Sequence, residues 1–405
     1  MAYRAITCVP IVHETLMRTL FDGLAHIRPR TLLYVAIGLM VLALTAQRSF
    51  YPHDHWTFWI FRASFRHLQH QQDLYARYGK HDLFKYSPTA AMLFAPAAFP
   101  PFALALLLWN AVNAGALVFA IKRISRDRDV VLALLLVLPE LFVTLQASQC
   151  NALIAALIVL SFVALERGHQ VRGFLAIAIG FVIKIFPIAA LGFAIFHPRR
   201  VRGAVVFAMC TLGLLLLPLL VTSPSMLLAQ YEWWHQVEAS DALLRGSSVM
   251  RILQQTWGIT WANWTVQVAG VLVLLLPLLH HERWGDQQFR RAFLASLLVF
   301  VVIFNHQAER PSYVIAATGV AIWFADSPRE PYRLLLVLLS LAGLRAWGYL
   351  PVWIVMQLEL HGVALESMLL GNRQRRLKMP VVVTAVETHS LADATRSERS
   401  RRSPA

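Results

Sequence analysis

Long apolar runs separated by short polar gaps occupy most of this chain. A membrane-spanning helix needs about 20 predominantly apolar residues. Runs of this kind, counted with their flanks, lie at 31–47, 102–121, 130–146, 150–166, 203–222, 264–281, 291–305, 311–326, 333–346 and 350–370. The pattern predicts an all-α polytopic membrane protein with about ten transmembrane helices within residues 31–371. We expect a short segment before it, 1–30, and a basic, disordered tail after it, 372–405.

The polar gaps alternate between arginine-rich and arginine-poor connections. The basic gaps are those around Arg28, Lys122, Arg167, Arg199, Arg283, Arg329 and Arg373. Because cytoplasmic loops carry an excess of Lys and Arg, we expect these gaps and both termini in the cytoplasm, with the spans in the plasma (inner) membrane. The two longest other gaps, 48–86 and 223–263, are then outer loops.

Two apolar segments break the simple count. Segment 174–196 is long enough to cross, yet basic residues flank it on both sides and it contains Lys184 and Pro187. A pair of re-entrant half-helices that turn between these two residues satisfies the charge rule and the proline together, and a plain span is the alternative. Segment 87–101 contains four prolines and is predicted to form a shallow outer hairpin.

An interfacial helix is predicted in the first outer loop. Its apolar side would carry Trp56, Trp59, Ile60, Ala63, Phe65 and Leu68, and its polar side Arg62, Arg66, His67 and Gln69. Loops of this length usually carry function.

Composition supports a bilayer protein and excludes several function classes. Hydrophobic residues make up 58% of the chain and charged residues 15%, unlike an ordinary soluble domain. The net charge of +15 lies in short gaps rather than on one face, so we expect no nucleic-acid partner. Three scattered cysteines indicate neither a disulfide framework nor a zinc site. The phosphate-loop, GxSxG and HExxH motifs are absent from the sequence, and we expect no cofactor.

The first outer loop begins with a candidate base. Asp54 lies just after the first span, between His53 and His55, where a carboxylate could take a proton from a sugar hydroxyl. A solvated loop acid is the alternative interpretation. Adjacent residues of an extended chain point to opposite faces, so the triplet is a weak metal signal and we expect no metal site.

Two further positions suit a phosphate. Lys184 lies in an apolar run, where a cation costs about 2.5–3.5 kcal/mol at the bilayer centre unless it is paired or hydrated. Its partner is either an acid, Glu140 or Glu309, or a lipid-linked phosphate. In the turn 305–311, Arg310 offers a forked donor and His306 can donate to phosphate or orient a hydroxyl, although dense polarity at a turn also occurs for solvation alone.

Groups suited to sugar binding occur in the outer connections. Trp233, Trp234 and Asp241 combine aromatic faces with a carboxylate, and the uncharged turn 146–151 presents the amides of Gln149 and Asn151. A belt of interfacial tryptophans is the alternative explanation for the aromatic residues. We expect the sugar or its acceptor to contact Tyr86, Gln149, Asn151, Trp233, Trp234 and Asp241.

Six stretches in a fixed order carry a family resemblance: 73–75, 84–89, 145–151, 180–187, 246–250 and 305–311. Through them the chain, from about 51 to 326, resembles glycosyltransferase family 87, polytopic mannosyltransferases of the C-type superfamily that take sugar from polyprenyl phosphates. The resemblance implies a C-type glycosyltransferase-like fold with Lys184 and His306 near the donor phosphate. The family's acidic position aligns close to Thr57, one turn after Asp54, so Asp54 is the predicted base and Asp73 the alternative.

The resemblance also implies a function. We expect an inverting, metal-independent hexosyltransferase, with mannose carried over from the family, that moves a sugar from a polyprenyl-phosphate donor to a glycolipid or glycan acceptor on the extracytoplasmic face. Asp54 would deprotonate the acceptor while Lys184, His306 and Arg310 hold the phosphate. The alternatives are a transporter or flippase of lipid-linked sugars, for which related halves are expected, and a non-catalytic membrane scaffold.

Overall fold

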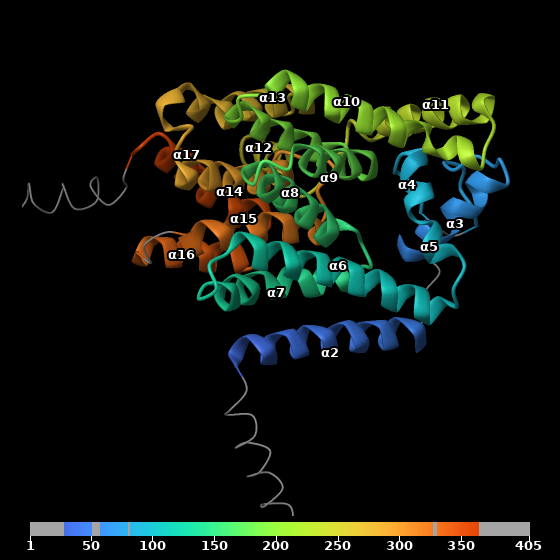
Figure 1. Ribbon diagram of the computed structural model, residues 1–405, viewed down its shortest axis with the longest axis horizontal. Coiled ribbons are helices and arrows are strands. Elements are labelled where there is room, and N and C mark those ends of the chain that lie inside the picture. Colours follow the sequence, from blue (N-terminus) through green and yellow to red (C-terminus); the bar gives the residue numbers. More distant parts are fainter. Residues whose placement is uncertain (1–27, 51–56, 80–81, 327–329, 364–405) are drawn as a thin grey trace, which may run out of the picture. The chain divides into compact units, whose positions relative to one another are not determined.

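The computed structural model describes residues 28–50, 57–79, 82–326 and 330–363, and the regular secondary structure in these ranges is all helical (Figure 1). Most of the predicted N-terminal segment, and the whole of the predicted tail, lie outside the described residues. The described helices belong to one compact unit, Met1–Gly362.

Helices occupy every predicted apolar run. They are α2 (Pro29–Phe50), α6 (Phe102–Ile124), α7 (Val130–Gln146), α8 (Asn151–Glu166), α10 (Arg200–Leu216) with η2 (Leu217–Leu220), α13 (Asn263–Leu275) with η3 (Leu276–Leu279), α14 (Gln287–Ile303), α15 (Tyr313–Asp326), α16 (Pro331–Leu341) and α17 (Ala346–Leu360). Three of the described helices, α2, α6 and α10 continued to Leu220, are long and apolar enough to cross a membrane. The others are shorter, so the number of ten crossings stays a prediction.

The core lies around α14 and α15, which pack side by side in the middle of the helices (Figure 1). Every residue of 293–304 and 313–324 is buried. Their close approach depends on Gly319, because a Cβ at this position would lie 2.5 Å from the carbonyl oxygen of Ala295. The peripheral helices instead expose large apolar side chains, including Leu39, Val112, Met209, Leu272 and Leu335. An apolar outer surface of helices is what a bilayer stabilises, and it supports a membrane protein.

Arginine–carboxylate pairs connect the basic gaps at one end of the helices, which we call the arginine end. Arg290 binds Glu166 through two hydrogen bonds of 2.8 and 2.7 Å, which joins α14 to α8. The other pairs are Arg30–Asp127 at 3.0 Å, Arg291–Asp326 at 2.5 Å and Arg333–Glu359 at 2.7 Å. The start of α2 and the end of α17 therefore lie at the same end of the unit.

The segment 174–196 is broken at Lys184. Helix α9 (Gln170–Ile183) ends where Lys184 takes an extended backbone, with φ −141° and ψ 139°, and the 3-10 helix η1 (Phe186–Phe196) follows. The start of α9 and the residues after η1 line one basin, so the chain returns to the arginine end. Gly180 permits the tight packing, because a Cβ there would lie 3.0 Å from Cβ of Pro187. The helix therefore breaks at the predicted turn.

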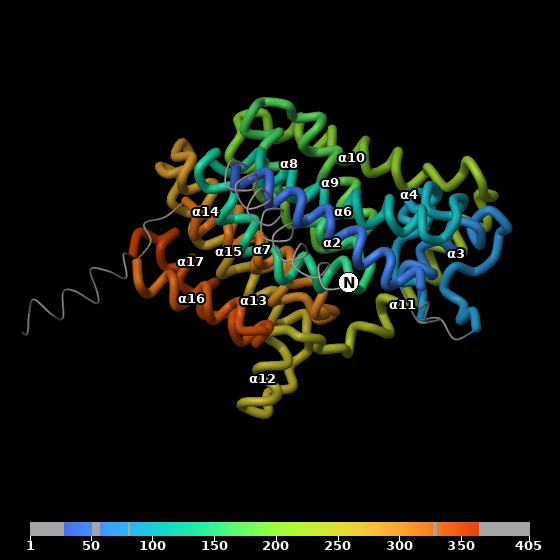
Figure 2. Tube along the Cα trace, turned by 90° about the horizontal axis from the view of Figure 1, so that it is seen from below, coloured from blue at the N-terminus to red at the C-terminus, as the bar shows by residue number. Residues whose placement is uncertain are grey.

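The remaining helices are α3 (Thr57–Gln69), α4 (Pro88–Leu93), α5 (Ala95–Ala98), α11 (Pro224–Asp241) and α12 (Val249–Trp257), with η4 (His281–Arg283) and η5 (Arg310–Ser312) in other connections. Of these, α3, α4 and α11 lie at the end away from α16 and α17 (Figure 2). Helices α11 and α12 were not predicted from the sequence. Helix α3 was predicted, but the prediction of which residues form its buried apolar face was partly wrong. Phe58 and Phe61 are fully buried, whereas Trp59, Ile60 and Ala63 are half-buried, and Trp56 lies outside the described residues.

The packing of α14 on α15 gives a first prediction. We expect Gly319→Ala to destabilise the protein by about 1–3 kcal/mol, because the new methyl group meets a backbone oxygen in a full core. The matched control is Gly213→Ala in α10, where a Cβ would have no neighbour within 4 Å and alanine has the higher helix propensity. Thermal unfolding of the purified proteins in detergent measures both. Equal midpoints for the two variants would contradict the close helix contact.

Candidate functional site

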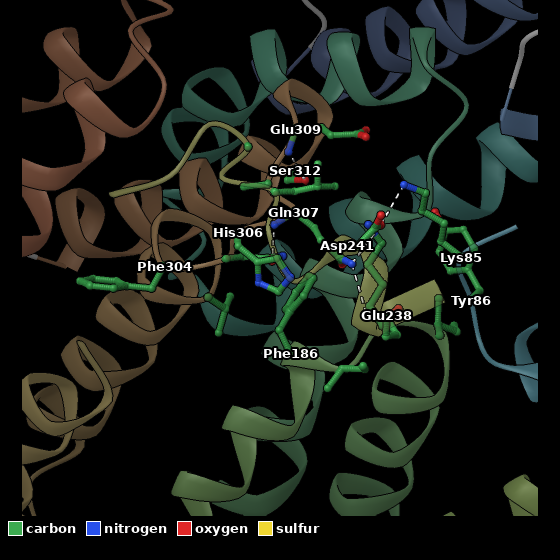
Figure 3. A pocket seen from close by; sticks show the side chains of 18 of the residues that line it. Lys85, Tyr86, Phe186, Glu238, Asp241, Phe304, His306, Gln307, Glu309 and Ser312 are labelled. Atoms are coloured by element: carbon green, nitrogen blue, oxygen red, sulfur yellow. Dashed lines mark hydrogen bonds and ion pairs between the residues drawn. The ribbon is translucent and has the colours of Figure 1, made fainter. Parts of the chain in front are cut away.

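A cavity of about 740 Å³ lies away from the arginine end, between the outer segments, the turn at Lys184 and the α14–η5 connection (Figure 3). Its volume falls in the usual range for small-molecule sites. One wall is apolar and is formed by Ile183, Ile185, Phe186, Ile188, Ala189, Val271, Phe300, Val301 and Phe304. The rest of the lining includes charged and polar groups: Lys85, Tyr86, Gln149, Lys184, Glu238, Asp241, Arg245, Arg251, Gln267, His306, Gln307 and Glu309.

The cavity brings together six of the residues singled out from the sequence: Tyr86, Gln149, Lys184, Trp234, Asp241 and His306. Asn151, Trp233 and Arg310 are not among its lining residues. Asp54 lies outside the described residues, and Thr57, the first described residue after that gap, lines the cavity. The alternative acid, Asp73, does not line it. Its carboxylate accepts a 2.8 Å hydrogen bond from the backbone of Tyr75.

Lys184 points its ammonium group at aromatic rings rather than at an acid. Its Nζ lies 5.7 Å from the ring centroid of Tyr86 and 5.9 Å from that of Phe186. Within the described ranges, Lys184 forms no hydrogen bond or ion pair with a side chain, and neither Glu140 nor Glu309 is its partner. Ser87 holds the neighbouring segment in place, since its hydroxyl donates to the carbonyl of Val182. The site thus presents an uncompensated cation to the cavity.

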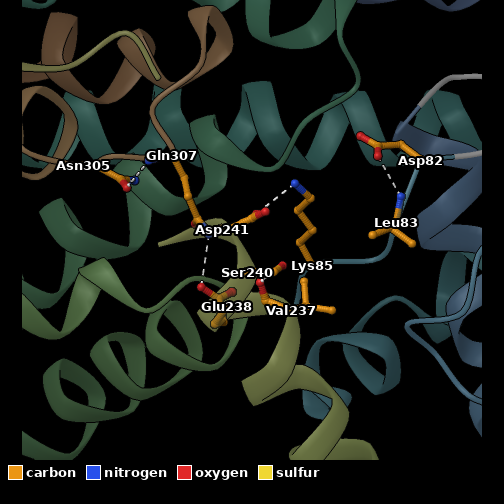
Figure 4. A network of polar contacts seen from close by, with 9 residues as sticks. All are labelled: Asp82, Leu83, Lys85, Val237, Glu238, Ser240, Asp241, Asn305 and Gln307. Carbon is orange, nitrogen blue, oxygen red and sulfur yellow. Dashed lines mark hydrogen bonds and ion pairs between the residues drawn. The ribbon is translucent and has the colours of Figure 1, made fainter. Parts of the chain in front are cut away.

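A carboxylate network lies across the cavity and joins the two outer loops (Figure 4). Nζ of Lys85 contacts Oδ2 of Asp241 at 2.8 Å. The side-chain amide of Gln307 donates to Oε2 of Glu238 at 3.1 Å and to Oδ2 of Asp241 at 3.3 Å. These contacts connect residues that are far apart in the sequence and place two carboxylates beside each other.

This arrangement shifts the acid–base properties of the network. Burial raises the pKa of Glu238, and the neighbouring charge of Asp241 raises it further. Burial lowers the pKa of Lys85, but the hydrogen bond and charge of Asp241 outweigh it, so the pKa of Lys85 is raised overall. Lys85 therefore neutralises Asp241, whereas Glu238 holds a proton more readily than an ordinary glutamate.

His306 presents a neutral donor to the same cavity. Gln267 donates its amide hydrogens to the carbonyl oxygen of Phe304 and to Nδ1 of His306, each at 3.1 Å. Since Nδ1 accepts, the imidazole proton lies on Nε2, and this buried atom has no partner among the described residues. Burial lowers the pKa of His306, against an opposing effect of Asp241, and favours the neutral ring.

The turn that carries His306 is fixed by two further contacts. The backbone N–H of Ser247 donates to the carbonyl of Ala308 at 2.7 Å, and a Cβ at Gly246 would lie 2.7 Å from the carbonyl oxygen of His306. Gly246 has φ +38°, a backbone conformation that suits glycine. Glu309 accepts from Nε2 of Gln149 at 2.9 Å, and Gln149 in turn accepts from Asn151 at 3.0 Å. Asn151 thus orients a cavity residue without lining the cavity.

The cavity combines three chemical environments. Lys184 and Nε2 of His306 can hold an anion such as phosphate, the network of Glu238, Asp241 and Gln307 can bind hydroxyl groups, and the apolar wall can accept a hydrocarbon chain. No group of three metal-ligating side chains occurs in the part of the chain that the structure describes.

Lys85 and Gln307 were not predicted as site residues from the sequence, and Glu238 was not assigned a role. Lys85 lies in stretch 84–89 and Gln307 in stretch 305–311, so the family resemblance marked their segments. The contact between Lys85 and Asp241 could not be predicted from the sequence, because 156 residues separate them.

The raised pKa of Glu238 gives a second prediction. A carboxyl group whose pKa is raised on folding stabilises the fold at low pH, and this contribution is lost as the pH rises through the folded-state pKa. We therefore expect Glu238→Gln to unfold at a higher temperature than the wild type at about pH 8, and at a similar temperature near pH 4. The exposed Glu232 of the same helix is the control, and Glu232→Gln should follow the wild type at both values. A constant difference across pH would contradict the raised pKa.

Comparison with known proteins adds the family. A search among curated proteins finds no match to this chain. The family model of glycosyltransferase family 87 matches residues 84–305, which is more than half of the chain. The matched region contains Lys85, Lys184, Glu238 and Asp241, and it ends at Asn305, the first residue of the turn that carries His306. The chain belongs to glycosyltransferase family 87 and is a glycosyltransferase with apolar membrane-type helices.

Proposed function

We propose that this glycosyltransferase transfers a hexose, mannose by its family resemblance, from a polyprenyl-phosphate donor to a glycolipid or glycan acceptor. The observation that carries the proposal is the uncompensated ammonium of Lys184 at the turn of a broken helix, inside a cavity that also has an apolar wall. A lipid-linked phosphate is the ligand class that needs both features.

The apolar wall suits the lipid part of such a donor. It is formed by Phe186, Ile188 and Ala189 together with Val271 and Phe300. Ile188 and Val271 of this wall are each 39% exposed. A hydrocarbon chain that enters sideways from the bilayer can therefore follow this wall toward Lys184. We assign the cavity to the extracytoplasmic side, because the arginine end suits the cytoplasm.

The expected reaction has one bond formed and one broken at the anomeric carbon. The acceptor hydroxyl attacks, the bond to the phosphate oxygen breaks through an oxocarbenium-like transition state, and the configuration inverts. Phosphate is a good leaving group and needs cations and hydrogen-bond donors more than a general acid. Lys184 would stabilise its charge, while Nε2–H of His306 would donate to one of its oxygens.

A carboxylate must remove the acceptor proton. We assign this role to Asp54 on the basis of the family resemblance. Glu238 and Glu309 are the alternative bases, because both line the cavity. Glu238 and Asp241, bridged by Gln307, would bind sugar hydroxyls. Trp234 would offer its face to the sugar ring.

Lys184→Gln tests the phosphate site. We expect transfer from a polyprenyl-phosphate hexose to fall by about 10²–10³-fold, because one transition-state contact is lost. The unfolding temperature should not fall, because Lys184 has no hydrogen-bond or ion-pair partner among the described side chains. Radiolabelled sugar transfer in detergent measures the rate. Lys184→Arg should restore part of it, and the exposed Lys122→Gln should leave it unchanged. Full transfer by Lys184→Gln would remove the phosphate role.

Asp54→Asn tests the base. We expect the transfer rate to fall by about 10²–10⁴-fold at unchanged expression, because an amide cannot accept the hydroxyl proton. Glu309→Gln, Glu238→Gln and Asp73→Asn are measured in parallel. If Asp54→Asn retains full activity while one of these three loses it, the base is that residue and the assignment to Asp54 is wrong.

A further inference from the structure

A second cavity lies at the base of the hairpin formed by α9 and η1, at the arginine end. It measures about 630 Å³ and is lined by Leu165, Gly168, His169, Gln170, Val171, Arg172, His197, Pro198, Arg199 and Arg202. We call it the basal basin. None of its lining residues belongs to the cavity around Lys184.

Three arginines of the basal basin have no carboxylate partner among the described residues. Elsewhere at the arginine end, Arg290, Arg291 and Arg333 each bind a carboxylate. Arg172, Arg199 and Arg202 form no ion pair or hydrogen bond with other described residues. Glu166, the acid nearest in sequence, accepts hydrogen bonds from Arg290 at both of its carboxylate oxygens. The basin is therefore lined by three free guanidinium groups and two imidazoles, with no carboxylate among its described lining residues.

Two helix starts add to this positive field. Helix α9 begins at Gln170 and α10 at Arg200, and neither helix has a side-chain cap. The first N–H groups of a helix carry a partial positive charge and bind anions when no side chain caps them. Arg200 is directed elsewhere, since its guanidinium lies 4.9 Å from the ring centroid of Trp284. The arginines and the helix starts therefore favour an oxyanion in the basin.

An apolar flank beside the basin indicates which anion. Val171 and Leu175 of α9 are exposed, and so are Val201, Val205 and Met209 of α10. Residues four apart lie on one face of a helix, so these side chains continue away from the basin as two apolar stripes. The helices are in close contact, because a Cβ at Gly203 would lie 2.5 Å from the ring of Phe174.

We propose that the basal basin binds the headgroup phosphate of an anionic membrane phospholipid, whose acyl chains lie along the apolar stripes of α9 and α10. The lipid connects Arg172, which begins one half of the hairpin, to Arg199 and Arg202, which follow the other half. It therefore stabilises the base of the hairpin that carries Lys184 at its turn. A water-soluble phosphate would use the same arginines but not the stripes.

The test is lipid titration of the full-length protein in a neutral detergent. Phosphatidylglycerol should raise the unfolding temperature in a saturable manner, because a ligand that binds only the folded state stabilises it. Phosphatidylcholine at the same mole fraction should not, since its headgroup carries no net negative charge. Inorganic phosphate is titrated in a third, parallel experiment. Native mass spectrometry counts the lipids that the protein retains. An equal response to both lipids would overturn the proposal, and an equal response to inorganic phosphate would overturn the lipid assignment.

The variant Arg172→Gln/Arg199→Gln/Arg202→Gln should bind phosphatidylglycerol roughly a hundredfold more weakly. Arg167→Gln is the matched control, because Arg167 is exposed at the same end but does not line the basin, and we expect a change under about twofold. If the triple variant does not fold, Arg199→Gln alone should weaken binding about fivefold. Equal binding by the arginine variant and Arg167→Gln would place the lipid elsewhere.

Discussion

Lys184, a cation among apolar helices with no carboxylate partner in the described part of the chain, is the constraint on which the rest of this structure depends. Lys184 follows the C-terminus of α9, whose partial negative charge stabilises a cation by about 0.3–1 kcal/mol. The rings of Tyr86 and Phe186, at 5.7 and 5.9 Å, contribute about 0.5–2 kcal/mol. These contributions are comparable with the cost of about 2.5–3.5 kcal/mol for a cation at the bilayer centre. The fold therefore tolerates Lys184 without neutralising it, and an anionic ligand can supply the missing charge.

Two features of the fold accompany this cation: the break in the helix at Lys184 and the pairing of Asp241 with Lys85. A continuous helix through 174–196 would satisfy its own carbonyl groups by backbone hydrogen bonds, whereas the break at Lys184 leaves the last carbonyl groups of α9 without helical partners. Asp241, a carboxylate of the same cavity, is already bound by Lys85 at 2.8 Å. Among the described residues, Asp241 thus has a cation as its partner, whereas Lys184 has no carboxylate.

The sequence predicted the parts of this fold that depend on local patterns. Uninterrupted apolar runs located α7 and α8 almost to the residue, and Lys184 with Pro187 located the broken helix. Helix α11 was missed because its face is not regularly apolar, and α3 was rotated because Phe58 and Phe61 pack on residues of α4 to α6. The network of Glu238, Gln307, Asp241 and Lys85 could not be predicted, because its members meet only through tertiary packing.

The neutral state of His306 gives this residue a different role from that of Lys184 in the proposed reaction. A cationic imidazole would add a second full positive charge to the proposed phosphate site. It would hold the released phosphate monoester, which carries more negative charge than the donor phosphodiester, more tightly than the donor. A neutral ring, whose pKa is lowered by burial, still donates from Nε2 and so orients the phosphate without adding a second full charge. Gln267 makes this possible, because its contact with Nδ1 keeps the proton on the nitrogen that has no other partner. In the proposed reaction, the charge of Lys184 and the hydrogen bond from His306 would therefore be separate contributions to one phosphate site.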